Sequence, residues 1–273
     1  MQKIALVTGA SSGIGAAITK ILAQHNIIVY AATRNTENIC SDKNIIPIKL
    51  DLTNNDSIKN CINEIMHNHH QIDFLINNAG YGSYGAIENV DLDEAYQQFE
   101  INLFSIAKLI KLVTPIMRDQ MSGRIINISS IAGKIPSKFG GWYCASKFAL
   151  EGFSDCLRME LKQFNIQVVL VEPGIIKTNW GPIAADHLKN SSINTIYSTE
   201  ANKVADVLVK NYASNFISSP DVIAKVVYKA ISSKHPKTRY CKGYMARPMI
   251  FLRKILTDRT YDKFYDWLMK IYN

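Results

Sequence analysis

The chain has 273 residues, of which 47% are hydrophobic and 20% are charged, and its mean hydropathy is −0.03. These values are typical of a globular protein and exclude a disordered or fibrous chain. A chain of this length can bury roughly three quarters of its unfolded surface, so it needs no disulfide or metal staple. No apolar run is long enough to span a bilayer, and the first predicted strand begins at residue 3, so we expect neither a membrane-spanning helix nor a secretory leader.

The net charge of +8 is concentrated near the C-terminus, since residues 225–273 carry +9 and residues 1–224 carry −1. Nucleic-acid-binding domains usually spread their basic groups over a reading surface. The sequence instead predicts a neutral body with a basic C-terminal extension over residues 234–273, and no nucleic-acid partner.

The cysteines and histidines give no sign of a metal or disulfide site. The five cysteines are scattered and form no CxxC pair, which indicates reduced thiols in a cytoplasmic protein. His67, His69 and His70 end a polar helical stretch and have no carboxylate or cysteine at a matching spacing. We therefore expect no metal.

Over the first 175 residues, short apolar runs alternate with longer amphipathic stretches. The runs rich in Ile, Val and Leu predict strands at 3–7, 27–33, 45–50, 73–77, 124–129 and 166–171. The amphipathic stretches predict helices at 13–25, 55–69, 92–119 and 142–164. Repeated strand–helix–strand units predict an α/β fold, with a doubly wound, Rossmann-like parallel sheet in a single domain spanning residues 1–273.

After Pro173 the pattern changes. Residues 179–220 are polar and rich in Asn and Ser, with short helical pieces near 200–213, and we expect this segment to form a mobile lid over a substrate. A helix is predicted to start at Ser219-Pro220-Asp221 and to end near residue 233, and residues 247–272 are predicted to be helical. The apolar residues of the lid are Trp180, Ile183, Leu188, Ile193, Ile196 and Tyr197. They favour a hydrophobic substrate, although any lid needs apolar groups in order to close.

A glycine-rich turn follows the first predicted strand and leads into a helix. It reads Thr8-Gly9-Ala10-Ser11-Ser12-Gly13-Ile14-Gly15. The three glycines allow a sharp turn, close approach of the backbone to a pyrophosphate, and close packing of the helix on the strand. Free N–H groups at the helix N-terminus attract phosphate. We therefore predict a dinucleotide-binding turn rather than a purely structural one, with contacts at Gly9, Ser11, Ser12, Gly13, Ile14 and Gly15.

The end of the second predicted strand indicates which dinucleotide is bound. A carboxylate there would bond the ribose hydroxyls and repel a 2′-phosphate, but the sequence has Thr33 and Arg34. A guanidinium can pair with a 2′-phosphate, so we expect NADP(H) to be preferred through Arg34. A solvated surface arginine is the alternative. NAD(H) also stays open, because the glycine turn contains no basic residue.

Four polar residues form a second pattern. Tyr143 and Lys147 are four residues apart in a predicted helix and therefore share one face. Ser130 follows a predicted strand, and Asn102 lies on an earlier helix. Taken singly, each has an ordinary structural explanation as a packing, solvated or capping residue. Taken together, beside a phosphate-binding turn, they indicate a catalytic group.

In order and spacing, these motifs closely resemble the short-chain dehydrogenase/reductase family over roughly residues 3–178. The resemblance implies a catalytic tetrad of Asn102, Ser130, Tyr143 and Lys147. It also implies that the residues contacting the adenine, the cofactor ribose and the nicotinamide are Asp51, Leu52, Asn78, Ala79, Gly80, Tyr143, Lys147, Pro173, Gly174, Ile176 and Thr178.

Elementary chemistry supports these roles. Hydride addition to a carbonyl leaves an oxyanion that needs a proton, and Tyr143 can supply it if its pKa falls from about 10. The Lys147 ammonium and a cationic nicotinamide would favour the phenolate. Ser130 can hydrogen-bond the substrate oxygen, and Asn102 can hold a water that passes the proton to solvent.

We therefore expect an NADP(H)-dependent oxidoreductase that interconverts an alcohol with its ketone or aldehyde. The long C-terminus resembles family members that act on steroids, retinoids or lipid-like ketones, so a hydrophobic substrate is expected. The alternative function is a non-catalytic dinucleotide-binding sensor or scaffold, which would not need Tyr143 or Ser130. Similar proteins pair their long helices about a two-fold axis, so a homodimer or homotetramer is expected.

The basic segment over residues 234–256 allows two interpretations. Its apolar residues, including Ile250, Leu252 and Leu256, can pack on the body and gate the substrate pocket. The flanking Lys and Arg residues can instead rest on an anionic membrane surface. The packed arrangement is the favoured one, since the body needs a cover there.

Overall fold

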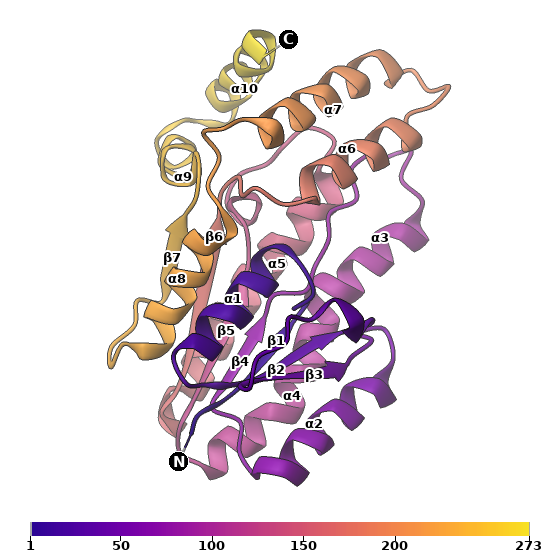
Figure 1. Cartoon of the computed structure of the whole chain (residues 1–273). Coiled ribbons are helices and arrows are strands. Elements are labelled where there is room, and N and C mark those ends of the chain that lie inside the picture. The colour runs from indigo at the N-terminus through magenta and orange to yellow at the C-terminus, as the bar shows by residue number, and fades with distance from the viewer. Residues whose placement is uncertain (1, 273) are drawn as a thin grey trace.

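The computed structural model describes residues 2–272, and the side chains of residues 2–270. Its centre is a parallel sheet of seven strands in the order β3-β2-β1-β4-β5-β6-β7 (Figure 1). The strands are β1 (Ile4–Thr8), β2 (Ile28–Thr33), β3 (Ile45–Lys49), β4 (Phe74–Asn77), β5 (Gly123–Ile128), β6 (Ile166–Pro173) and β7 (Arg239–Lys242). The doubly wound sheet expected from the alternating pattern is thus confirmed.

Helices cover both faces of the sheet, and this explains why the strand sequences are apolar without alternation. On one face, α1 (Gly13–Gln24) and α8 (Pro220–Ser232) bury residues such as Ile18 and Ile223. The other face is covered by α2 (Asn55–His69), α4 (Ser105–Asp119) and α5 (Gly141–Leu161). Each face therefore has its own hydrophobic core.

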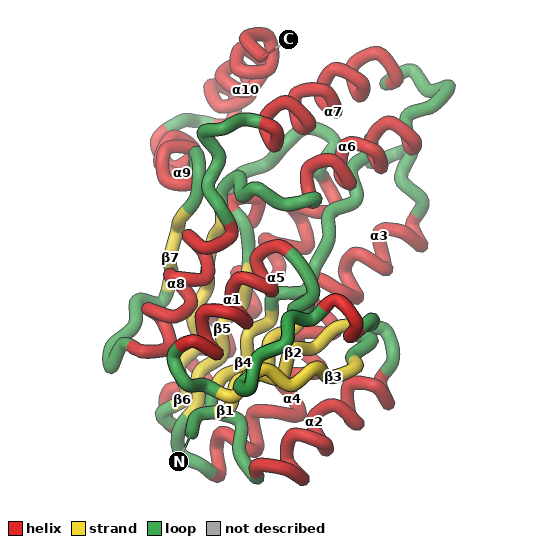
Figure 2. Tube along the Cα trace, viewed as in Figure 1, coloured by secondary structure: helices red, strands yellow, loops and turns green. Residues whose placement is uncertain are grey.

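The order of the strands determines where a ligand can bind. The chain runs outward from β1 to β3 and then returns to place β4 on the other side of β1. At such a switch point the loops after neighbouring strands diverge and leave a crevice at the carboxyl ends of the strands. Figure 2 shows the green loops that follow these strands gathered at this edge of the sheet.

The stretch over residues 92–119, predicted as one helix, follows a continuous helical path with an irregular centre. It consists of α3 (Leu92–Phe99), a π-helical turn η2 (Glu100–Phe104), and α4. A π-turn inserts an extra residue into the helix and commonly occurs at functional sites. Here it turns Asn102 inward, where the side chain is fully buried.

The C-terminal third departs most from the sequence-based expectations. The polar segment contains a helical hairpin of α6 (Trp180–Ser191) and α7 (Ser198–Ala213), of which α6 was not expected. Strand β7 was also not expected. Residues 247–272 are helical as predicted, but they form two helices, α9 (Ala246–Ile255) and α10 (Asp258–Tyr272), separated by a break at Leu256 and Thr257.

Helix α9 packs on the body through one side only. Met249 and, just after the helix, Leu256 pack with Ile135 and Tyr261. Of the three residues named in the packed interpretation, only Leu256 belongs to this cluster as described, and Ile250 and Leu252 do not. No residue of α9 lines the large cleft described below, so the gating part of that interpretation finds no support in the described residues. Among residues 2–272, no helix combines the length and apolar character needed to cross a bilayer.

Candidate active site

The turn after β1 has the shape that the glycines predicted. Gly9 and Gly13 have φ angles of +64° and +53°, in the region that side chains disfavour. A Cβ on Gly15 would lie 2.1 Å from the Gly9 carbonyl oxygen, so α1 can pack this close to the turn only with glycine there. In the described structure the Ser12 side chain does not cap α1, and the first N–H groups of the helix are left free to bind an anion.

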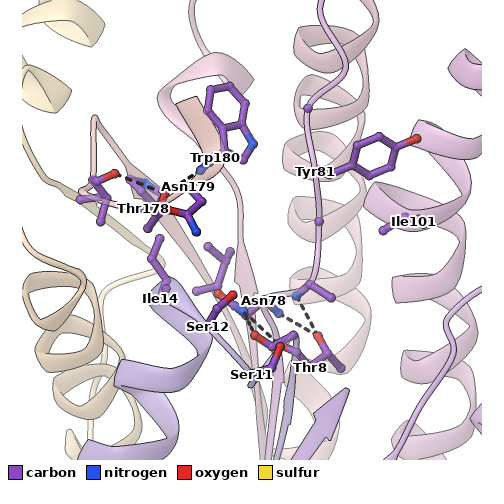
Figure 3. A pocket seen from close by; sticks show the side chains of 18 of the residues that line it. Thr8, Ser11, Ser12, Ile14, Asn78, Tyr81, Ile101, Thr178, Asn179 and Trp180 are labelled. Atoms are coloured by element: carbon purple, nitrogen blue, oxygen red, sulfur yellow. Dashed lines mark hydrogen bonds between the residues drawn. The ribbon is translucent and has the colours of Figure 1, made fainter. Parts of the chain in front are cut away.

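Asn78, which follows the adjacent strand β4, braces this turn together with Thr8 at the end of β1. The Asn78 side-chain amide donates to the carbonyl oxygens of Thr8 and Gly9 at 2.9 and 3.3 Å. The Thr8 hydroxyl accepts from the backbone N–H groups of Asn78 and Ala79, both at 3.0 Å (Figure 3). Asn78 and Ala79, which are expected to contact the cofactor ribose, therefore hold the glycine turn in place. The Asn78 side-chain amide is already hydrogen-bonded to this turn.

A single cleft of about 1050 Å³ runs along the carboxyl edge of the sheet and joins the residues expected to bind the cofactor with those expected to react. Its wall contains these predicted residues: Gly9, Ser11, Ser12, Gly13, Ile14, Arg34, Asp51, Leu52, Asn78, Ala79, Gly80, Ser130, Tyr143, Lys147, Pro173, Gly174, Ile176 and Thr178. Of the predicted site residues, Gly15 and Asn102 are not on the wall; both lie behind it.

At one end of the cleft, Arg34 faces a region that suits an adenosine. The loop after β3 presents Asp51, whose carboxylate accepts from the hydroxyl and backbone N–H of Thr53 at 2.7 and 2.9 Å. These bonds, and secondarily the positive charge of Arg34, lower the pKa of Asp51. Glycine backbone, free helix N–H groups and an arginine together fit a dinucleotide.

At the other end, Tyr143 and Lys147 lie on the cleft-facing side of α5. Tyr143 is buried, which raises the pKa of its phenol, whereas a hydrogen bond to Ser130 acts in the opposite direction. The Lys147 ammonium donates to the carbonyl oxygen of Ile128 at 3.1 Å and lies 6.0 Å from the centre of the Tyr143 ring. Burial lowers the pKa of Lys147 to about 8. The proton-transfer groups expected from the sequence are thus brought together.

The contacts of Asn102 in this structure are structural, and its expected role of holding a water stays a prediction. Its amide donates to the carbonyl oxygen of Tyr81 at 2.9 Å and to the Ser146 hydroxyl at 3.0 Å, and its oxygen accepts from the Tyr81 N–H at 3.2 Å. These contacts link the π-turn to α5 and to the loop after β4. In this structure Asn102 therefore supports the cleft wall from behind.

Trp180, the first residue of α6, covers Tyr143. Its ring centre is 5.1 Å from that of Tyr143, and it stacks on Tyr212 of α7 at 6.0 Å. A Cβ on Gly82 would lie 2.4 Å from the Trp180 ring, so only glycine leaves room for the indole. Figure 3 shows Trp180 across the cleft from Tyr81.

The apolar residues of the predicted lid lie in different surroundings. Trp180 and Ile183 line the cleft, and Leu188 is buried between the helices of the hairpin. Ile193 and Ile196, however, point to solvent at the tip. Tyr212 and the loop residues Tyr81 and Gly82 also line the cleft and were not identified from the sequence, because no motif marks them.

The chain matches a known protein family and several named relatives. A sequence model described as short chain dehydrogenase matches residues 3–187. The chain is 34% identical over 265 residues to the probable short-chain type dehydrogenase/reductase VdlC of Helicobacter pylori, covering 96% of each chain. It is 32% identical over 271 residues to a 3-ketodihydrosphingosine reductase of Bacteroides thetaiotaomicron, covering 97% of this chain and 93% of the relative.

Solved structures give the same result. A short-chain dehydrogenase from Streptomyces avermitilis superimposes with a TM-score of 0.81 at 26% identity, covering 98% of this chain and 96% of the other. A metagenomic short-chain oxidoreductase in complex with NADP superimposes with a TM-score of 0.68 at 27% identity, covering 87% and 95%. Both the fold and the sequence pattern are therefore shared with this family.

Proposed function

The chain belongs to the short-chain dehydrogenase/reductase family of oxidoreductases, and we propose that it is an NADP(H)-dependent member that interconverts a hydrophobic alcohol with its ketone or aldehyde. The observation that carries this proposal is the single cleft. It joins a glycine turn suited to a pyrophosphate with Ser130, Tyr143 and Lys147.

In the reductive direction, a bound nicotinamide dinucleotide supplies hydride to the carbonyl carbon. The Tyr143 hydroxyl then donates its proton to the developing alkoxide, and the Ser130 hydroxyl hydrogen-bonds the same oxygen. The Lys147 ammonium stabilises the phenolate that remains. In the oxidative direction, the Tyr143 phenolate removes the alcohol proton.

The oxidative direction needs the Tyr143 phenolate, and this form is accessible near neutral pH only when positive charge is near. Burial alone raises the pKa of its phenol, which would keep the base protonated at neutral pH. The Lys147 ammonium, 6.0 Å from the ring, and an oxidised nicotinamide are the positive charges that would reverse this. The phenolate is therefore expected to form mainly in the cofactor complex.

The choice of cofactor rests on Arg34. It lines the cleft at the end of β2, beside Thr33, where a carboxylate would select against a 2′-phosphate. The double substitution Thr33→Asp with Arg34→Ala should therefore shift the ratio of kcat/KM values from NADPH toward NADH, by at least about tenfold. Equal use of both cofactors by the wild type would contradict the role given to Arg34.

The substrate chamber is rich in aromatic residues. The Trp180 ring contacts those of Tyr143 and Tyr212, with ring centres 5.1 and 6.0 Å away, and Ile183 also lines the cleft. Such walls favour an apolar substrate over a sugar or an amino acid. The relative named as a 3-ketodihydrosphingosine reductase has a keto substrate in its name, in agreement with a lipid-like ketone here.

A panel of ketones and aldehydes with NADPH tests the proposed function. The panel should contain steroid, retinoid and long-chain keto compounds, with short polar ketones for comparison, and oxidation of NADPH is followed by absorbance. Turnover that increases with the apolar size of the substrate is the expected result. NADPH binding without turnover of any member would instead favour the sensor or scaffold function.

We also propose that the protein self-associates through the outer side of its long helices. Phe104 of η2 and Phe148 and Met159 of α5 are 51%, 45% and 64% exposed, more than such large apolar side chains usually are. Light scattering at micromolar protein should give at least twice the chain mass of 30.7 kDa, and Phe104→Asp should reduce it. A wild-type mass of one chain would contradict a stable dimer.

A further inference from the structure

Behind the catalytic residues lies an ionic cluster that the reaction as described does not use. It consists of Lys134 after η3 (Ile131–Gly133), Glu151 and Asp155 of α5, Glu172 of β6, and Arg239 of β7. Glu151 and Glu172 are almost fully buried, at 3% and 4% exposed. Buried carboxylates are costly unless they are paired, so such a cluster calls for an explanation.

Glu151 is the centre of this cluster. Its Oε2 lies 2.8 Å from the Lys134 ammonium and 3.1 Å from Nε of Arg239. Arg239 also contacts Glu172, at 3.3 Å, and Asp155, at 2.5 Å. The cluster thereby links α5 with the loop after Ser130 and with the strand that leads into Pro173 and Gly174.

Glu151 lies one helical turn after Lys147, so the two side chains share a face of α5. Helical side chains lean toward the N-terminus, which brings the Glu151 stem over the turn that carries Lys147. Gly133 confirms this placement. A Cβ there would lie 2.9 Å from Cγ of Glu151 and 3.0 Å from the carbonyl oxygen of Lys147.

The pKa shifts of the neighbouring groups agree with this placement of Glu151. Burial lowers the pKa of Lys147, and the negative charge of Glu151 opposes that effect. Burial, and then the charge of Glu151, raise the pKa of Glu172. The titratable and charged groups around this turn are Tyr143, Glu151 and Asp155 on α5, Lys134 after η3, Glu172 on β6, and Arg239 on β7.

We propose that Glu151 is a positioning residue for the reaction: clamped by Lys134 and Arg239, it holds the turn of α5 that presents Lys147 and places a negative charge behind the Lys147 ammonium. The inference rests on the proposed function, because it assigns Glu151 to the same proton-transfer group. Glu151 itself does not line the cleft and acts through Lys147.

Two substitutions that change the local charge in opposite directions test this role. Lys147 must stay protonated for alcohol oxidation, so its deprotonation sets the alkaline limb of the pH profile of kcat/KM. Glu151→Gln removes a negative charge and should move this limb to lower pH, whereas Lys134→Met removes a positive charge and should move it to higher pH. The shift for Glu151→Gln should be roughly 0.5–1 pH unit, the size expected for a nearby unit charge at an effective dielectric constant of about 40–80, and the opposite shift for Lys134→Met should be smaller.

Asp155→Asn is the matched control. It removes another carboxylate that pairs with Arg239, but Asp155 is two turns from Lys147 and is more exposed. Its alkaline limb should move by less than half as much as that of Glu151→Gln. A general loss of packing would lower activity in all three variants without moving the limb in opposite directions, so the pH profile separates positioning from structural support.

The wild-type profile is the internal reference. A wild type that turns over normally, with the limb unmoved in both Glu151→Gln and Lys134→Met, contradicts the positioning role and leaves the proposed function standing. A wild type without turnover contradicts both the proposed function and the positioning role of Glu151. If Glu151→Gln does not fold, Lys134→Met decides alone, because its side chain is 31% exposed and leaves Glu151 paired with Arg239.

Discussion

Replacing Tyr143 with Phe should lower turnover by a factor of about 10²–10⁴ while leaving NADPH bound, because only the proton donor is removed. The ring and its contacts with Trp180 remain, so the lid should keep its position. Steady-state kinetics with the best ketone of the panel, together with NADPH fluorescence titration, measure the two effects separately.

Tyr84→Phe is the control for this substitution. Tyr84 is buried next to Tyr143, with ring centres 6.0 Å apart, and its hydroxyl bonds Ser137 rather than facing the cleft. Removing that hydroxyl should change turnover by less than about tenfold. Retention of more than a tenth of wild-type turnover in Tyr143→Phe would show that another group donates the proton.

Replacing Lys147 with Met should abolish the reaction and weaken cofactor binding, yet make the fold more stable. Turnover should fall by about 10²-fold or more, because the phenolate loses its nearest cation. The stabilisation arises because Lys147 is only 5% exposed and its charge is desolvated in the folded state. Lys111→Met, at an exposed position of α4, should change neither property.

The size of this stability effect depends on pH. The pKa of Lys147 is lowered from 10.5 to about 8 on folding, so the ionised form disfavours the folded state by up to about 3 kcal/mol. This penalty is fully present below pH 8 and disappears as the pH rises toward 10.5. Thermal melts should therefore show Lys147→Met above the wild type at pH 7, with the difference shrinking above pH 8. A variant that melts below the wild type at pH 7 would contradict this argument.

The parallel sheet, the glycine turn and the pairing of Tyr143 with Lys147 could be predicted because each depends on short-range sequence. Strands such as β1 and β2 are continuous apolar runs, and the Gly9 turn joins a strand to a helix within eight residues. Tyr143 and Lys147 are fixed relative to each other by one helical turn. Local patterns of this kind do not depend on how the rest of the chain folds.

The missed features depend on distant contacts. Strand β7 has only four residues, and it forms because β6 offers an open edge. Helix α6 contains Gly181 and Pro182 near its start, which suggest a loop until Tyr212 is seen to pack on its first turn. The position of Trp180 over Tyr143 follows from the same hairpin and has no local signal.

The surroundings of Asn102 and Glu151 could not be predicted from the sequence, for a different reason. The resemblance to a family predicted that Asn102 matters, but its contacts became visible only when the π-turn placed it behind the loop that carries Tyr81. Glu151 looks like an ordinary helix-surface acid in the sequence. Its burial requires cations from Lys134 and Arg239, which are 17 and 88 residues away.

The late position of Arg239 along the chain has a consequence for how the protein is made. During synthesis, Glu151 and Glu172 emerge well before Arg239, since chains appear from the N-terminus at about 5–20 residues per second. Until β7 pairs with β6, Glu151 has only Lys134 as a partner, and Glu172 lacks the guanidinium that it contacts in the finished fold. Burying a carboxylate without its cation is costly, so the nascent chain is expected to keep the β6 edge open until β7 has been made.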